Sequence, residues 1–142
     1  MEVITIDLRF QNMEQAIAAY VVVGQGGPVL VETGPGSTLE QVHAGLFDHG
    51  MSASDIRHVF VTHIHLDHAG AAGWWAGQGA QVYVHHRGAR HLIDPSRLLG
   101  SAKRIYGEVM DDLWGPILPV PAEQLHELRD DDVVCVNGLE IV

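Results

Sequence analysis

Residues 63–68 read His-Ile-His-Leu-Asp-His, so four side chains that commonly bind metal ions fall within six positions. In an extended segment, residues two apart point to the same side, so His63 and His65 can bind one ion together. Asp67 and His68 lie beyond a bend and are better placed to bind a second ion beside it. The fold of this chain should therefore bring these four side chains close together. The end of a central strand in an α/β sheet is a position where binding sites occur.

The hydrophobic pattern around this segment alternates between strand and helix periods, which is typical of an α/β or α+β domain. The first three strands are expected to form an antiparallel meander, and Asn137-Gly138 predicts a hairpin between the last two. A capping box at Ser37 and Glu40 and a stop at Gly50 delimit the first expected helix. We expect strands at 2–10, 16–23, 29–32, 57–62, 81–85, 133–136 and 139–142, and further helices at 69–78 and 95–114.

Composition excludes several other classes of protein. The 142 residues are 46% apolar, which excludes a disordered chain, and the single cysteine, Cys135, excludes a disulfide scaffold. Eighteen acidic residues against eight Lys and Arg give a formal charge of −10, which disfavours binding to nucleic acid or to an anionic membrane. No signal peptide and no continuous apolar run of membrane-spanning length is found, so we expect a cytoplasmic protein with a reduced Cys135.

The segment 62–70 resembles the HxHxDH signature of the metallo-β-lactamase-fold hydrolases. The order of the preceding elements matches as well: a strand meander, the loop Glu32-Thr33-Gly34-Pro35-Gly36, a helix and the signature strand. The resemblance is greatest to the glyoxalase-II-like and lactonase-like branch. It implies one domain over residues 1–142 that forms the first sheet and its helices of an αββα sandwich.

The resemblance also implies a chemistry. His63 and His65 would bind the first metal of a binuclear centre, and Asp67 and His68 the second. Zinc is the expected cofactor, with iron or manganese as alternatives. A metal-activated hydroxide would attack a small-molecule ester, thioester or lactone, and Asp67 would hold this nucleophile and pass a proton to the leaving group.

Two departures from the family pattern leave alternatives open. Glu32 stands where the family usually has an aspartate that orients a ligand histidine. The chain is also shorter than the family members, and the later histidines and bridging aspartate of the family have no counterpart in it. We therefore expect the N-terminal part of a larger hydrolase. The alternative is a truncated or degenerate non-catalytic domain that binds metal weakly or pairs with another chain, for example as a homo-oligomer through its unfinished sheet.

Two other activities of the same superfamily are weaker hypotheses. A nuclease is disfavoured by the charge of −10, and a flavodiiron oxidoreductase by its different signature. Outside the signature, we expect solvated or structural roles for the remaining candidates. These are His85, His86 and His91 after a strand, the Asp130-Asp131-Asp132 turn, and the aromatic residues Trp74, Trp75, Tyr106 and Trp114, for which core packing is the favoured role.

Overall fold

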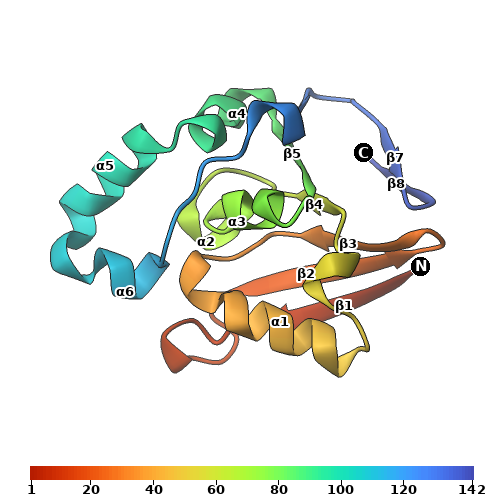
Figure 1. The fold of residues 1–142 in the computed structure, drawn as a ribbon, viewed down its shortest axis with the longest axis horizontal. Coiled ribbons are helices and arrows are strands. Elements are labelled where there is room, and N and C mark those ends of the chain that lie inside the picture. The colour runs from red at the N-terminus through yellow and green to blue at the C-terminus, as the bar shows by residue number, and fades with distance from the viewer.

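The computed structural model describes residues 1–142 as a six-stranded sheet with helices on one face and a hairpin on the other (Figure 1). The strands of the sheet follow the order β1-β2-β3-β4-β5-β6, and β7 and β8 form a separate two-stranded sheet. The mixed α/β class is therefore confirmed. The strands are β1 (Glu2–Asp7), β2 (Ala18–Gly24), β3 (Gly27–Val31), β4 (His58–Phe60), β5 (Gln81–His85), β6 (Leu125–Leu128), β7 (Val134–Val136) and β8 (Leu139–Ile141).

The sheet changes from antiparallel to parallel at β3. Strands β1, β2 and β3 form the expected antiparallel meander, with Thr5 opposite Tyr20. Strands β3 to β6 are parallel, with Leu30 opposite Val59 and Tyr83 opposite His126. Because parallel strands end at the same edge, the residues that follow β3, β4 and β5 gather at one side of the molecule.

Helices cover one face of the six-stranded sheet, and the larger hydrophobic core lies between them and the sheet. None of them combines the length and the apolar character needed to cross a membrane. Helix α1 contacts β1, and α3 and α4 contact β5. The helices are α1 (Leu39–Asp48), α2 (Leu66–Ala69), α3 (Ala72–Gly77), α4 (His86–Ile93), α5 (Ser96–Tyr106) and α6 (Met110–Trp114), with short 3₁₀ turns between some of them.

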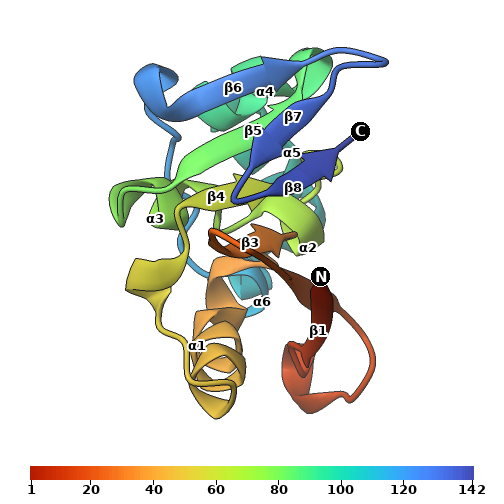
Figure 2. The ribbon, with the colours of Figure 1, turned by 90° about the vertical axis from the view of Figure 1, so that its right-hand side faces the viewer.

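The two faces of the sheet are packed differently. On the helical face, fully buried side chains such as Leu30, Val59 and Trp75 form one large core. On the opposite face, Phe60 and Tyr83 pack in a small cluster with Leu139 of the hairpin. Figure 2 shows β7 and β8 lying in front of the sheet on this second face. The Asn137-Gly138 hairpin is confirmed, and its left-handed φ angles of 51° and 75° explain that pair of residues.

The start of α1 differs from the prediction. Ser37 lies in a 3₁₀ turn (Gly36–Thr38) and its hydroxyl donates to the carbonyl of Leu113 at 2.6 Å instead of capping the helix. Phe47, expected on the apolar stripe of this helix, is 79% exposed. A capping box does form, but at Ser52 and Asp55, before a short 3₁₀ turn.

The expected helix over 95–114 is wrong as one continuous element. It is divided at Gly107, whose φ of 56° cannot continue a right-handed helix, into α5 and α6. The expected helix at 69–78 is likewise two elements, α2 and α3. Helix α4 was not predicted, because its sequence is mostly polar and follows directly on β5.

Candidate metal centre

The segment 63–68 lies at the edge where the parallel strands end. Strand β4 stops at Phe60, and the chain bends at Thr62 and His63 before it enters α2, which begins at Leu66. Strand β3 ends beside it, so that Glu32 follows Val31 at the same edge. This edge is the usual position of binding sites in α/β folds.

The loop after β3 is fixed against α2 by backbone contacts. The backbone N–H of Thr33 donates to the carbonyl of His68 at 2.7 Å, and that of Ala71 donates to the carbonyl of Gly34. A Cβ atom on Gly70 would lie 2.9 Å from the Cα of Pro35, so only glycine permits this approach. The loop and the signature segment therefore form one unit, although they are far apart in sequence.

Glu32 occupies the inner end of this unit. Glu32 is 5% exposed, and its φ of 64° is a left-handed value that residues other than glycine rarely adopt. Its Oε1 accepts a hydrogen bond from the backbone N–H of Thr62 at 3.1 Å. Its Oε2 lies 3.4 Å from His68 Nδ1, although it receives no well-directed hydrogen bond. The strained backbone thus holds a buried carboxylate against a candidate ligand.

The three histidine rings of the signature are gathered around His63. The centroid of its ring lies 4.7 Å from that of His65 and 4.1 Å from that of His68. His68 lies between two carboxylates, with Nδ1 facing Glu32 and Nε2 lying 3.2 Å from Asp67 Oδ2. His63 Nδ1 pairs with the hydroxyl of Thr62 at 3.0 Å. Nδ1 of His63 is thus held by a hydrogen bond, whereas Nδ1 of His68 faces the Glu32 carboxylate without one. A side chain of the protein at Nδ1 is how ligand histidines are usually oriented.

The protonation of His63 also suits metal binding. Partial burial lowers the pKa of His63, and the positive charges that His68 and His65 can carry lower that pKa further, against an opposing effect of Glu32 and Asp67. A pKa below the usual value of a histidine keeps the ring neutral near pH 7. The neutral ring is the form that binds a metal.

The residues fit a divalent metal by their chemistry. Imidazoles and a carboxylate are the donors that zinc and iron prefer, and Glu32 Oε2 is a buried acceptor without a hydrogen bond. The geometry, however, places no group of three or more His, Cys, Asp or Glu side chains so that they could hold one ion. The structure therefore assembles the donors as neighbours, with Asp67 and His68 in contact with each other.

The other candidate residues lie apart from this cluster. His85, the last residue of β5, places its Nε2 3.2 Å from Asp130 Oδ1, and Asp130 is highly exposed. Trp75 is fully buried in the core, as expected, with Trp74 packed against its edge. Cys135 is exposed, because its side chain points away from the hairpin's packed face.

Tyr106 and Trp114 pack against the small buried cluster of Leu66, Ala102 and Met110, which confirms the expected core packing, but they have a second position as well. Both line a cavity of about 360 Å³ that also includes His65 and Asp67. Their spacing in sequence fitted a helix interior, and only the break at Gly107 brings them together here.

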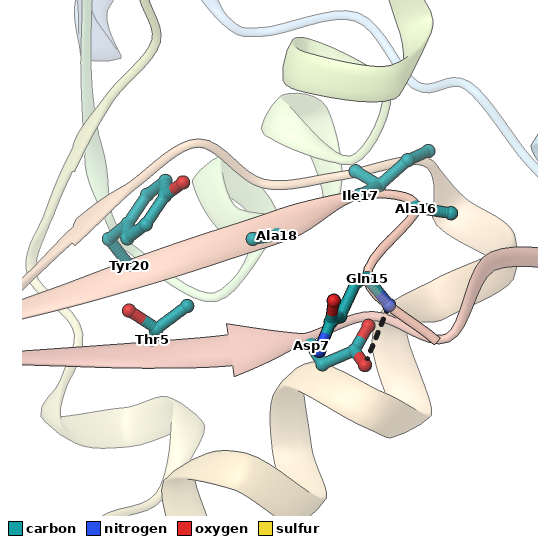
Figure 3. Close-up of a pocket in the computed structure, with 7 residues that line it drawn as sticks. All are labelled: Thr5, Asp7, Gln15, Ala16, Ile17, Ala18 and Tyr20. Carbon is teal, nitrogen blue, oxygen red and sulfur yellow. Dashed lines mark hydrogen bonds between the residues drawn. The ribbon is translucent and has the colours of Figure 1, made fainter. Parts of the chain in front are cut away.

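A second hollow, of about 300 Å³, lies on β1 and β2 (Figure 3). Its one charged residue, Asp7, accepts backbone hydrogen bonds from Arg9 and Gln15 at 3.0 Å each. These bonds lower the pKa of Asp7 and commit the carboxylate to the loop that follows β1. This hollow shares no residue with the signature segment, so we assign it no role in metal binding.

Comparison with known proteins gives one family. The family model described as the metallo-beta-lactamase superfamily matches residues 14–140. No curated protein matches the chain. Solved structures with this fold do match, and the chain spans about half of their length.

Three solved structures illustrate the likeness. A metallo-beta-lactamase family protein from Thermus thermophilus is 22% identical with a TM-score of 0.71, covering 98% of this chain and 49% of the other. The native FEZ-1 metallo-beta-lactamase from Legionella gormanii is 17% identical with a TM-score of 0.70, covering 96% and 47%. A beta-lactamase from Chitinophaga pinensis is 27% identical with a TM-score of 0.65, covering 87% and 43%.

Proposed function

Because the chain belongs to the metallo-beta-lactamase superfamily, we propose that its signature segment supplies metal ligands for the hydrolysis of a small ester, thioester or lactone. Members of this superfamily are generally metal-dependent hydrolases that bind divalent metals, commonly zinc. The observation that carries the proposal is the cluster of three histidine rings around His63, with His68 held between Glu32 and Asp67.

Each residue of the cluster has a proposed role. His63 and His65 would hold one metal ion, and Asp67 and His68 a second. When bound, the metal would lower the pKa of a water molecule and stabilise negative charge on the carbonyl oxygen of the substrate. Glu32, whose carboxylate faces His68 Nδ1 at 3.4 Å, would orient His68, and Thr62, which is hydrogen-bonded to His63 Nδ1, would orient His63. Asp67 would move a proton from the nucleophile to the leaving group.

Zinc titration of the purified 142-residue chain tests this proposal. We expect about two equivalents of zinc, by elemental analysis after dialysis, and loss of most of this metal in the double variant His63→Ala/His65→Ala. The control is His49→Ala/His91→Ala, which removes two histidines outside the cluster and should leave the stoichiometry unchanged. A screen of small esters, thioesters and lactones would follow, with Asp67→Asn as the variant that should lose turnover.

The opposite result has a clear meaning. Equal zinc in both double variants would refute the proposed ligand set, and no bound zinc would refute the proposal that this chain forms the metal site by itself. The absence of zinc would favour the alternative that this chain is a non-catalytic domain, which binds metal weakly or pairs with another chain.

A further inference from the structure

A cavity of about 360 Å³ adjoins the signature segment, and six of the nine residues that line it are apolar. Leu66 forms its inner wall, between His65 and Asp67. The opposite wall comes from α5 and α6, which together with α4 curve around α2 in Figure 1. Its volume is at the lower end of the range of roughly 300–1,000 Å³ that is typical of small-molecule sites.

The outer wall of the cavity is held in place. Tyr106 and Trp114 meet edge to face, with ring centroids 5.3 Å apart, because the chain turns at Gly107 between them. Trp114 also stacks on Phe10 at 5.4 Å. The adjacent carbonyl of Leu113 accepts the hydroxyl hydrogen of Ser37 at 2.6 Å. These contacts join the end of α6 to the segments around Phe10 and Ser37, so tertiary contacts fix the position of this wall.

The chemistry of the lining selects its occupant. Ile105 lines the cavity and is 75% exposed, so a ligand in the cavity would remove apolar surface of this side chain from water. Asp67 is the one acidic residue of the lining, and no Lys or Arg lines it. With the formal charge of −10 on the chain, this lining disfavours an anionic group. An uncharged, apolar occupant fits.

The position of the cavity indicates what that occupant is attached to. His65 and Asp67 belong both to the cavity wall and to the candidate metal ligands. A molecule with its carbonyl group at the histidine cluster would therefore place the neighbouring part of its structure between Leu66 and the Tyr106–Trp114 pair.

We propose that this cavity binds the hydrocarbon chain of the substrate, and that the substrate class is a neutral ester, thioester or lactone that carries an alkyl or acyl chain. This inference rests on the proposed hydrolytic function, because it names the substrate of the same site. It assigns Ile105, Tyr106 and Trp114 as residues that determine specificity.

Binding of uncharged amides to the metal-free chain tests the cavity alone. The probes are butanamide, hexanamide and octanamide, which are neither hydrolysed nor dependent on metal. Binding is followed by NMR at the indole N–H of Trp114, a buried group that makes no hydrogen bond and that is assigned through Trp114→Phe. We expect affinity to rise roughly fourfold for each added methylene group, since each buries additional apolar surface.

The variant Ile105→Asp should abolish this dependence on chain length, whereas Val109→Asp should preserve it. Val109 is also an exposed aliphatic residue, 52% exposed, but does not line the cavity. Equal affinity for the three amides, or equal behaviour of the two variants, would overturn the inference. Failure of the proposed hydrolytic function would be seen separately, as loss of zinc binding with the amide series unchanged.

Discussion

Glu32 shows at the scale of one residue how this fold positions a functional group at a cost in backbone strain. A non-glycine residue at φ 64° is disfavoured by roughly 1–3 kcal/mol. The strain persists because the carboxylate is tied to Thr62 on one side and faces His68 on the other. The sequence identified Glu32 only through the family resemblance, since a lone acid at the end of a strand carries no other signal.

The variant Glu32→Gln separates the two roles of this side chain. The amide oxygen can still accept the hydrogen bond from the Thr62 backbone, but the negative charge beside His68 Nδ1 is lost. We expect the unfolding midpoint to change little and the affinity for zinc to fall about 10- to 100-fold, which is typical when the partner of a ligand histidine is removed. Competition with a chromophoric chelator would measure the affinity. Unchanged affinity would mean that Glu32 serves only the backbone of the loop.

At the scale of the element, local signals predicted strands and turns better than helices. The strand over 81–85 was placed at its observed bounds, because a short apolar run between polar residues specifies it. The Asn137-Gly138 hairpin followed from the φ angles that its turn requires. The helices failed where tertiary contacts override local pattern. The sequence around Ser37 predicts a helix cap, yet its hydroxyl donates a hydrogen bond to the carbonyl of Leu113, which is 76 residues away in sequence.

The sequence identified residues 63–68 as a metal-binding motif, but it predicted only part of the arrangement of their side chains. The spacing of His63 and His65 indicated that they lie together, and their rings do so. That His68 would approach His63 as well could not be predicted from the spacing, because it depends on the turn into α2 and on the loop of Glu32. The apolar cavity was missed for the same reason, since its two walls come from elements separated by α3, β5 and α4.

The break between α5 and α6 gives a prediction for these elements. Gly107 has φ 56° and ψ −126°, a conformation that side chains strongly disfavour, and no atom would obstruct a Cβ there. Gly107→Ala should therefore destabilise the protein by about 1–3 kcal/mol through backbone strain alone. Gly100→Ala is the matched control, because Gly100 is inside α5 with equally open surroundings. That variant should stabilise by about 0.5–1 kcal/mol.

Urea unfolding would measure both variants. Opposite shifts of the midpoint would confirm that the turn at Gly107 is imposed by its backbone conformation. Shifts in the same direction would mean that the chain can form one longer helix, and with it a different wall beside Leu66.

At the scale of the whole molecule, the two faces of the sheet are covered unequally. The helical face is continuous with the main core, whereas β7 and β8 cover only part of the other face (Figure 2). Val3 and Tyr20 lie on that second face beyond the hairpin, and they are 56% and 39% exposed. Tyr20 also lines the hollow of Figure 3. Exposed apolar surface beside an edge strand is typical of a surface that associates.

We therefore predict that the chain self-associates through this face. Sedimentation equilibrium should show a dimer that dissociates on dilution, and Val3→Lys/Tyr20→Lys should weaken it by more than about tenfold, because two charges would be buried without partners. The control Phe47→Lys/Val109→Lys adds the same charge at exposed apolar positions on α1 and in the turn before α6, and it should leave the dimer intact. A monomer at all concentrations, or equal weakening by both double variants, would contradict the prediction. Because the signature segment lies at the edge of the sheet rather than on this face, zinc binding should be the same in the dimer and in the lysine variant.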